Sequence, residues 1–131
     1  MTMAIVAAGC SQSLPDRAPV SGQVIYHGKP LLFGAVMFQP QRGWPARGVI
    51  EPDGVFHLST YGDRDGAAIG FHRVRVSCYE KQRPGAVPNG GNAEKGLGAS
   101  LIPLRYTDIN SSGLTAEVRA TNEPLVFELK D

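Results

Sequence analysis

Hydrophobic and polar residues alternate in short runs from Val20 to Leu129, and turn-forming residues such as glycine, proline and aspartate separate the runs. Strict alternation places successive side chains on opposite faces of a strand, so that one face can be buried and the other solvated. About seven such runs occur, with no convincing long helix, which predicts an all-β sandwich. The expected strands lie within 20–26, 34–40, 46–52, 55–60, 71–80, 113–120 and 124–131.

The alternation also sorts the side chains of each run by face. In the run 71–80, one face consists of Val74, Val76 and Cys78, and the other of Arg73, Arg75 and Ser77. We therefore expect a buried cysteine and a solvated arginine pair in this strand. Further residues grouped on one face are Val20, Gly22, Val24, Tyr26, Val36, Phe38, Phe56, Leu58, Leu114, Ala116, Val118, Leu125, Phe127 and Leu129.

Turn signals divide the runs. Asp53-Gly54 is a strong hairpin signal between the runs 46–52 and 55–60. The segment 81–100 is polar, rich in glycine and proline and without periodicity, which predicts one long flexible loop. The apolar segment 101–108 is interrupted by a proline, and we expect a single helical turn or an irregular cap in which Leu104 and Tyr106 pack on the sandwich.

Residues 4–13, "AIVAAGCSQS", contain a short apolar stretch that leads into Cys10. Ala7-Ala8-Gly9-Cys10 resembles the bacterial lipobox, in which small residues precede a cysteine that is acylated and becomes the mature N-terminus. The resemblance implies a truncated signal-like segment (1–9), a tether (10–18) and a β-sandwich domain (19–131), with the bilayer bound through acylated Cys10. The alternative is a frayed apolar N-terminus with an incidental cysteine.

Three further stretches carry a family likeness: "VSGQVIYHGKPLLFGAVMFQP", "GVIEPDGVFHLST" and "GFHRVRVS". In this order they resemble the carboxypeptidase regulatory-like domain, which is related to the transthyretin-like sandwiches. Residues 62–70 and 102–118 are similar to segments of small lipoproteins of planctomycete-type bacteria. The resemblance implies a seven-stranded antiparallel Greek-key sandwich (transthyretin-like, Ig-like) on a lipid tether, within a group of mostly unassigned role.

Charge and cysteine content narrow the classes of partner. The 13 basic and 12 acidic residues nearly cancel, so the chain lacks the electrostatic footprint of a nucleic-acid-binding protein. Two cysteines do not make a disulfide framework, and if Cys10 is acylated then Cys78 is left alone as a small buried residue. A bridge between the two cysteines remains the alternative.

The three histidines lack the spacing of a metal site or of a catalytic motif. His27 falls on a turn, whereas His57 belongs to the outward set of its run and is expected to be solvated. His72 is in register with Val74, and we expect a hydrogen-bonded structural role at the edge of the core. We therefore assign no catalytic, cofactor-binding or metal-ligating residue.

Two loops hold the candidate partner-binding residues. Asp63 and Asp65 in "DRDG" resemble a fragment of a calcium loop, but the third acid and the bidentate glutamate are missing, which favours a solvated turn. Trp44 is the only tryptophan, and it either stacks on a sugar or partner peptide or folds back over the sandwich.

These patterns favour a non-catalytic, membrane-anchored lipoprotein module of the cell envelope. Its unknown protein or glycan partner would bind the loops around Trp44, 61–70 and 81–100. The alternative is an enzyme or accessory domain acting on envelope polysaccharide or peptide, which requires His57 or His72 to face Asp63. A third reading is edge-to-edge assembly of sandwiches.

Overall fold

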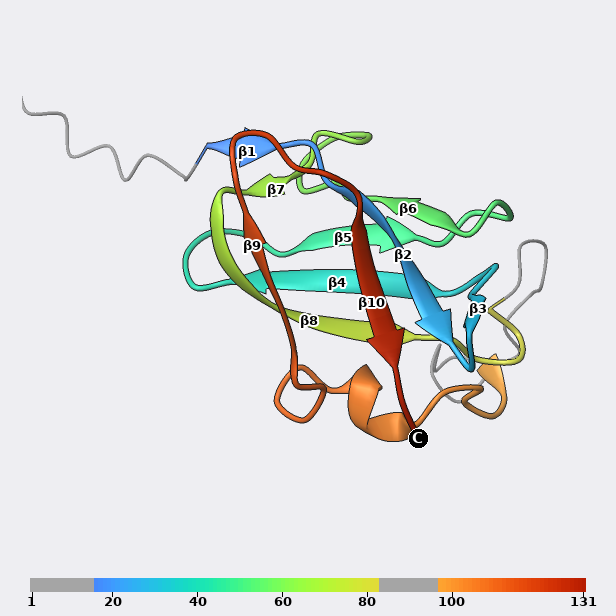
Figure 1. The fold of residues 1–131 in the computed structure, drawn as a ribbon. Helices are drawn as coiled ribbons and strands as arrows, with labels where there is room; N and C mark the ends of the chain where they lie inside the picture. Colours follow the sequence, from blue (N-terminus) through green and yellow to red (C-terminus); the bar gives the residue numbers. More distant parts are fainter. Residues whose placement is uncertain (1–15, 83–96) are drawn as a thin grey trace, which may run out of the picture.

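Figure 1 shows the computed structural model, which describes residues 16–82 and 97–131. Within these ranges the chain is all-β, with ten strands and a 3₁₀ turn, η2 (Leu104–Thr107). The strands are β1 (Arg17–Ala18), β2 (Ser21–Tyr26), β3 (Lys29–Pro30), β4 (Ala35–Pro40), β5 (Ala46–Val49), β6 (Val55–His57), β7 (Ala67–Ala68), β8 (Gly70–Ser77), β9 (Leu114–Val118) and β10 (Leu125–Leu129).

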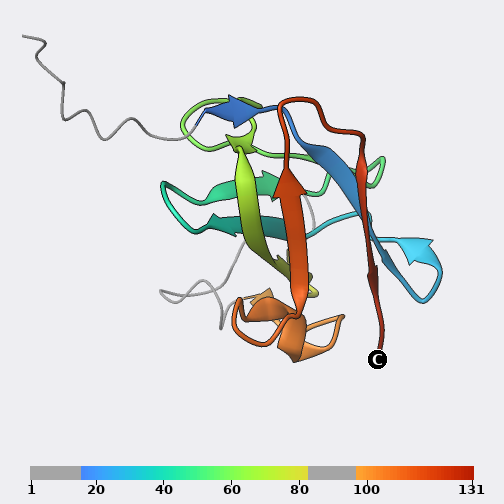
Figure 2. The same cartoon turned by 60° about the vertical axis from the view of Figure 1, so that its left-hand side comes forward.

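Two four-stranded sheets pack against each other, as Figures 1 and 2 show from two directions. The first, which we call the β4 sheet, has the order β5-β4-β8-β9. In the second, the β2 sheet, β10 lies on one side of β2, while β3 and β6 pair with the other. The short strands β1 and β7 form a separate ribbon at one end.

The folded part begins earlier than the sequence pattern indicated. Arg17 and Ala18, which we expected in the tether, form β1 and pair with Ala68 and Ala67. Ala18 is buried in the core cluster, because its strand closes one end of the space between the sheets. Cys10 and the rest of the segment 1–15 lie outside the described residues.

One strand pair is parallel, so the expectation of a wholly antiparallel arrangement is wrong at this point. β10 runs parallel to β2, with Leu125 opposite Gly22 and Leu129 opposite Tyr26. The last two runs therefore do not pair with each other, because the chain between β9 and β10 crosses from the edge of the β4 sheet to the edge of the β2 sheet.

The expected turn at Asp53-Gly54 is present, but its two arms enter different sheets. Gly54 has a φ of 87°, and the Asp53 Oδ1 accepts a hydrogen bond of 3.0 Å from the backbone N–H of Val55. β5 pairs with β4, whereas β6 pairs with β2. The arms meet again at an isolated bridge between Arg47 and Ser59, and in this way the turn links the two sheets.

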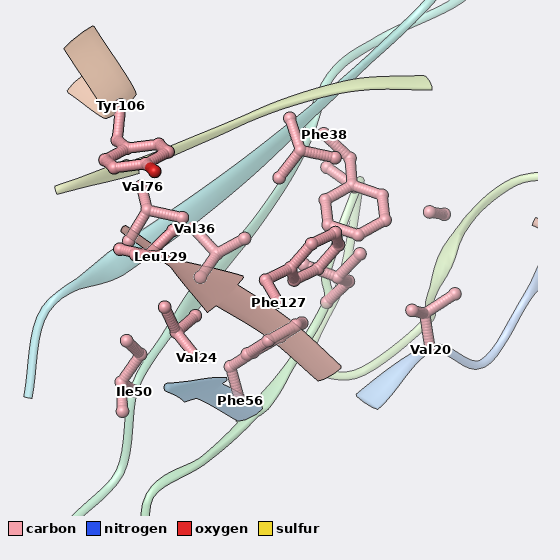
Figure 3. Close-up of a cluster of buried hydrophobic side chains, with 14 of the residues drawn as sticks. Val20, Val24, Val36, Phe38, Ile50, Phe56, Val76, Tyr106, Phe127 and Leu129 are labelled. Atoms are coloured by element: carbon pink, nitrogen blue, oxygen red, sulfur yellow. The ribbon is translucent and has the colours of Figure 1, made fainter. Parts of the chain in front are cut away.

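The inward faces of both sheets supply one hydrophobic core (Figure 3). Phe127 lies edge-on to Phe38 of the opposite sheet, with ring centroids 5.8 Å apart, and stacks on Phe56 at 6.4 Å. Such aromatic contacts stabilise a core beyond the area that they bury. The predicted inward positions are confirmed as buried or half-buried, and those only half-buried are Tyr26, Leu114, Ala116 and Leu125.

Cys78 is buried at the end of β8, as its place in the alternation predicts, and its Sγ lies 3.5 Å from the backbone oxygen of Phe33. Next to it, Tyr79 and Ser100 form a β-bridge, and the backbone N–H of Lys81 donates to Leu97 at 2.8 Å. The two ends of the expected loop 81–100 are therefore held together, whereas residues 83–96 lie outside the described ranges.

The 3₁₀ turn η2 closes the other end of the core. Tyr106 is buried, and its Oη bonds both the backbone N–H (2.8 Å) and the backbone oxygen (2.9 Å) of Lys130. Leu104, which we expected to pack beside Tyr106, is 66% exposed because a 3₁₀ turn places neighbouring side chains on different sides. No helix within the described ranges has the length and hydrophobicity needed to span a bilayer.

Substitution of Gly22 by alanine tests the β2–β10 contact. A Cβ at this position would clash with the backbone oxygen of Leu125 and lie 2.9 Å from the Phe56 Cζ. We expect Gly22→Ala to lower the free energy of unfolding by about 1–3 kcal/mol, as overpacking does. The measurement is urea denaturation followed by circular dichroism.

Gly62→Ala is the matched control, because a Cβ there meets no atom within 4 Å and its backbone is not left-handed. Equal unfolding midpoints for the two variants would contradict the close approach of β10 to β2.

Candidate functional site

Trp44 lies in the loop between β4 and β5 and is 63% exposed. The indole does not fold back over the end of the sandwich, so that alternative is wrong. An exposed indole presents a large rigid surface for stacking. This observation keeps Trp44 as a candidate contact residue.

Asp65 holds the turn that follows β6. Its carboxylate accepts backbone N–H bonds from Thr60 at 2.6 Å, Tyr61 at 3.0 Å and Gly62 at 3.1 Å, and it pairs with Arg17. Burial alone would raise the pKa of Asp65, but these donors outweigh it and hold the pKa below the ordinary value of 3.8. Asp65 therefore acts as a turn former, as the sequence favoured.

Asp63 is exposed, and within the described ranges it has no hydrogen-bond or ion-pair partner. The two carboxylates of "DRDG" are thus used differently, since only Asp65 is committed to the turn. In the described part of the chain, no three His, Cys, Asp or Glu side chains group as metal ligands would.

His72 is fully buried, and its Nε2 lies 2.6 Å from the backbone oxygen of Ala68. Desolvation by burial is the main influence on this ring and lowers the pKa of His72, which favours the neutral imidazole. The ring packs against Phe38, with centroids 5.6 Å apart. The expected hydrogen-bonded structural role of His72 is confirmed.

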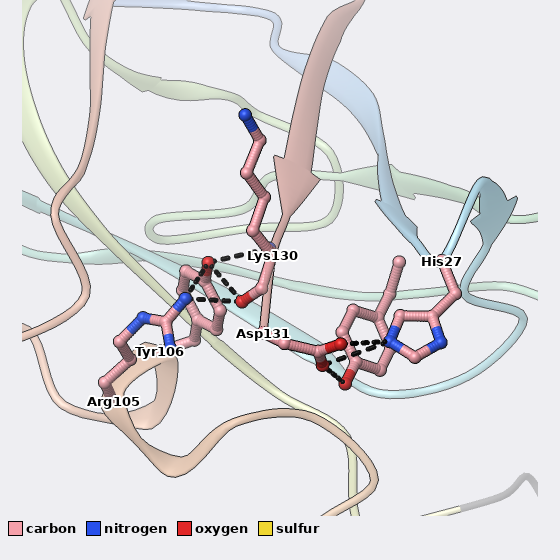
Figure 4. Close-up of polar contacts among 6 residues, drawn as sticks. His27, Arg105, Tyr106, Lys130 and Asp131 are labelled. Carbon is pink, nitrogen blue, oxygen red and sulfur yellow. Dashed lines mark hydrogen bonds and ion pairs between the residues drawn. The ribbon is translucent and has the colours of Figure 1, made fainter.

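His27 belongs to a surface cluster, which we call the C-terminal clasp (Tyr26, His27 and Asp131; Figure 4). The Tyr26 hydroxyl donates to the Asp131 carboxylate at 2.5 Å, and the His27 Nε2 lies 3.0 Å from the same group. The bonds from Tyr26 and His27 lower the pKa of Asp131, and the bond to Asp131 raises the pKa of Tyr26. The clasp fastens the segment after β10 to the end of β2.

Three arginines share the outward face of the β4 sheet. We call Arg47, Arg73 and Arg75 the arginine face. Met37 on β4 stands opposite Arg47 of β5 on one side and Arg75 of β8 on the other. Strands two apart in a sheet are separated by roughly 10 Å, so both guanidinium groups can reach the space above Met37.

Within the described ranges no carboxylate forms an ion pair with the arginine face. None of the ion pairs formed among the described residues includes Arg47, Arg73 or Arg75. Arg73 donates to the Asn110 Oδ1 at 3.0 Å, and Arg75 makes only a weak contact of 3.5 Å with the Met37 Sδ. The Nε of Arg75 is buried with no hydrogen-bond partner among the described residues.

Above Arg47 and Arg75 the surface is hollowed. A shallow depression of about 180 Å³ is lined by Arg47 and Arg75 together with Met37, Ser77, Ala35 and Val36. It adjoins a larger hollow of about 890 Å³ that shares Met37, Arg47, Arg75 and Ser77. The further lining residues of this larger hollow are Tyr79, Gln82, Leu97, Thr107, Asp108 and Ile109. Among the described residues, Asp108 is the single carboxylate in either lining.

A second surface feature bears on the catalytic alternative. His57 is half-buried, and it lines a cavity of about 360 Å³ together with Ser59 and Asp63. Arg64 and Glu51, which also line this cavity, form an ion pair of 2.9 Å with each other. Of the two histidines that the catalytic alternative considered, His57 therefore shares a cavity with Asp63, whereas His72 is buried in the core.

The arginine face was only partly visible in the sequence. Alternation placed Arg73 and Arg75 on the outer side of their strand, but it did not bring Arg47 beside them. The usable signal was the order of "VMFQP" and "ARGV", because a hairpin between these strands sets Arg47 opposite Met37.

A comparison of the chain with protein-family models, with curated proteins and with solved structures finds no match.

Replacement of Asp65 by asparagine tests the turn. The neutral amide loses the acceptor that serves Tyr61, Gly62 and Arg17. We expect Asp65→Asn to lower the free energy of unfolding by about 1–2 kcal/mol at neutral pH, as loss of charge-assisted bonds at a partly exposed site does. Denaturant unfolding measures the difference.

The difference between wild type and Asp65→Asn is expected to shrink as the pH falls below the ordinary aspartate pKa. A carboxyl with a depressed folded pKa stabilises the fold above its unfolded pKa, and this stabilisation is lost as acid protonates it. Asp63→Asn is the matched control and leaves stability nearly unchanged. A pH-independent difference would contradict the role of the Asp65 charge.

Proposed function

We propose that this chain is a non-catalytic lipoprotein module, held at a membrane of the cell envelope through acylated Cys10, which binds an envelope glycan or protein. The observation that carries the binding role is the arginine face, whose three cations have no carboxylate partners among the described residues and two of which, Arg47 and Arg75, border a hollow. A packed two-sheet core beneath it provides a rigid support for recognition.

The anchor in this proposal rests on the sequence Ala7-Ala8-Gly9-Cys10, whose small residues suit the extended backbone that a signal peptidase binds. Acyl chains on a cysteine bind a bilayer through their methylenes, and two or more chains are needed for stable attachment. Because the lipobox-like sequence resembles an export signal, we propose that the protein lies on the periplasmic or outer side of the membrane.

We also propose that the domain belongs to the carboxypeptidase regulatory-like group, with the seven-stranded Greek-key topology of transthyretin-like sandwiches. Support comes from the ordered motifs quoted above and from the all-β architecture with two packed sheets. Of the ten strands in the described ranges, β1, β3 and β7 have only two residues each and would count as extensions of this plan.

The alternative function is an enzyme or enzyme-accessory domain that acts on envelope polysaccharide or peptide. One observation favours it, namely the cavity that His57 shares with Ser59 and Asp63. A histidine with a nearby carboxylate can act as a general base, provided that both groups reach the substrate.

Cys10→Ser tests the anchor. We expect wild-type protein in the membrane fraction of a bacterial host, and loss of nearly all of this recovery in the variant, because no acyl chain can be attached. Immunoblotting of fractions measures the result. Cys78→Ala is the matched control and keeps membrane recovery. Wild-type protein found free of membranes would contradict the anchored function.

His57→Ala and Asp63→Asn separate the two functions. If the module binds its partner through the arginine face, both variants capture envelope glycan or protein as well as wild type does, within about twofold, since neither residue belongs to that face. If the domain is an enzyme, hydrolysis of envelope polysaccharide or peptide is detectable with wild type and falls by at least about a hundredfold in each variant. Release of reducing ends or new amines provides the measurement.

A further inference from the structure

We propose that the arginine face binds an oxyanion, a carboxylate or a sulfate, carried on a hydroxyl-rich sugar chain. This inference rests on the proposed binding function and names its ligand class. It follows from three observations: the placement of the charges, the unmet hydrogen-bonding capacity of Arg75 and the neutral polar groups around the hollow.

The charges are placed for an anion that spans Met37. Arg47 and Arg75 line the same depression from strands on either side of β4, and no acidic residue of the described ranges lines it with them. A guanidinium group offers planar donors that match an oxyanion in a two-point arrangement. The larger hollow also contains Asp108, whose Oδ1 accepts the backbone N–H of Asn110 at 2.8 Å, so that two positive charges and one negative charge line it among the described residues.

Of the three arginines, Arg75 is the one with a buried nitrogen that lacks a hydrogen-bond partner among the described residues. Its side chain is half-buried, its Nε has no partner among the described residues, and its Nη2 contacts a thioether, which is a weak acceptor. A buried cationic donor without an acceptor is unfavourable. An oxyanion above Met37 supplies the missing negative charge to this guanidinium.

The remaining polar groups of the hollow fit sugar hydroxyls. Ser77 accepts a hydrogen bond of 2.9 Å from the Gln82 Nε2, which leaves its own O–H free to donate to a ligand oxygen. Tyr79 and Thr107 also line the hollow, and because the Thr107 hydroxyl already donates to the backbone oxygen of Leu104 at 2.6 Å, it can only accept from a ligand. Hydroxyls that both donate and accept are matched by a sugar chain, whose own hydroxyls do the same.

The position of the hollow argues against a peptide as the ligand. Peptides that bind sheets commonly add a strand to an open edge, where backbone groups supply the affinity. The depression lies over β4, whose backbone is paired on both sides at Met37, with Arg47 of β5 and with Arg75 of β8. Side-chain recognition of charge and hydroxyls is what this face offers.

The test titrates the full-length lipidated protein, in detergent, with four polymers: polygalacturonate, dextran sulfate, neutral dextran and polyglutamate. We expect one of the two acidic polysaccharides to bind, and the one that does identifies the oxyanion. Binding should weaken as salt is added, because exposed charges are screened. Calorimetry gives the Kd for each polymer.

Arg47→Gln and Arg75→Gln are each expected to raise this Kd about tenfold, equivalent to roughly 1.4 kcal/mol. Arg119→Gln removes the same charge from an exposed position that lines neither part of the hollow, and should change the Kd less than about twofold. Because Arg47 is exposed, its variant tests the site even if Arg75→Gln fails to fold. Thermal unfolding checks each variant.

Equal Kd values for wild type, Arg47→Gln and Arg119→Gln would overturn the inference, as would binding of none of the polymers. Tighter binding of polyglutamate than of either acidic polysaccharide would also overturn it and identify an acidic peptide as the ligand. These results leave the Cys10→Ser fractionation unchanged, so failure of the ligand class is distinguishable from failure of the membrane-anchored function.

Discussion

Phe127 of β10 packs edge-on against Phe38 across the core and stacks on Phe56 within its own sheet. This contact joins the two sheets and also fixes β10 beside β2, where Gly22 leaves room for the Leu125 backbone and for the Phe56 ring. The outward face of the β4 sheet can carry unpaired arginines because the inward face of the same strands is held by this core. Packing and recognition are thus properties of opposite sides of β4 and β8.

The two ends of the core are closed differently. At one end the β1–β7 ribbon covers the space between the sheets, and Arg17 of β1 pairs with Asp65, which in turn holds the backbone of residues 60–62. At the other end Tyr106 enters the core and bonds the backbone of Lys130, beside the C-terminal clasp. Although different elements close the two ends, at each end a side chain forms hydrogen bonds to backbone groups: Asp65 at one and Tyr106 at the other. Such bonds constrain the geometry more than further apolar packing would.

Local alternation was enough to place single side chains. Val74, Val76 and Cys78 point inward because side chains alternate along any strand, whatever its neighbours are. Strand pairing is not local: β9 and β10 are separated by a short turn-like segment yet lie in different sheets, and the parallel partner of β10 is near the start of the domain. For the same reason local alternation did not place Arg47 beside Arg75, since that depends on the register of β4 with both of its neighbours.

The parallel pairing of β10 with β2 determines how late in synthesis the domain can fold. Residues near position 22 must pair with residues near position 125, so the β2 sheet is completed only when the chain has been synthesised as far as β10. Contacts between such distant residues form slowly, because a long loop must be closed first. If the chain is exported as we propose, the domain would therefore stay unfolded, and able to pass through a translocation channel, until β10 has been synthesised.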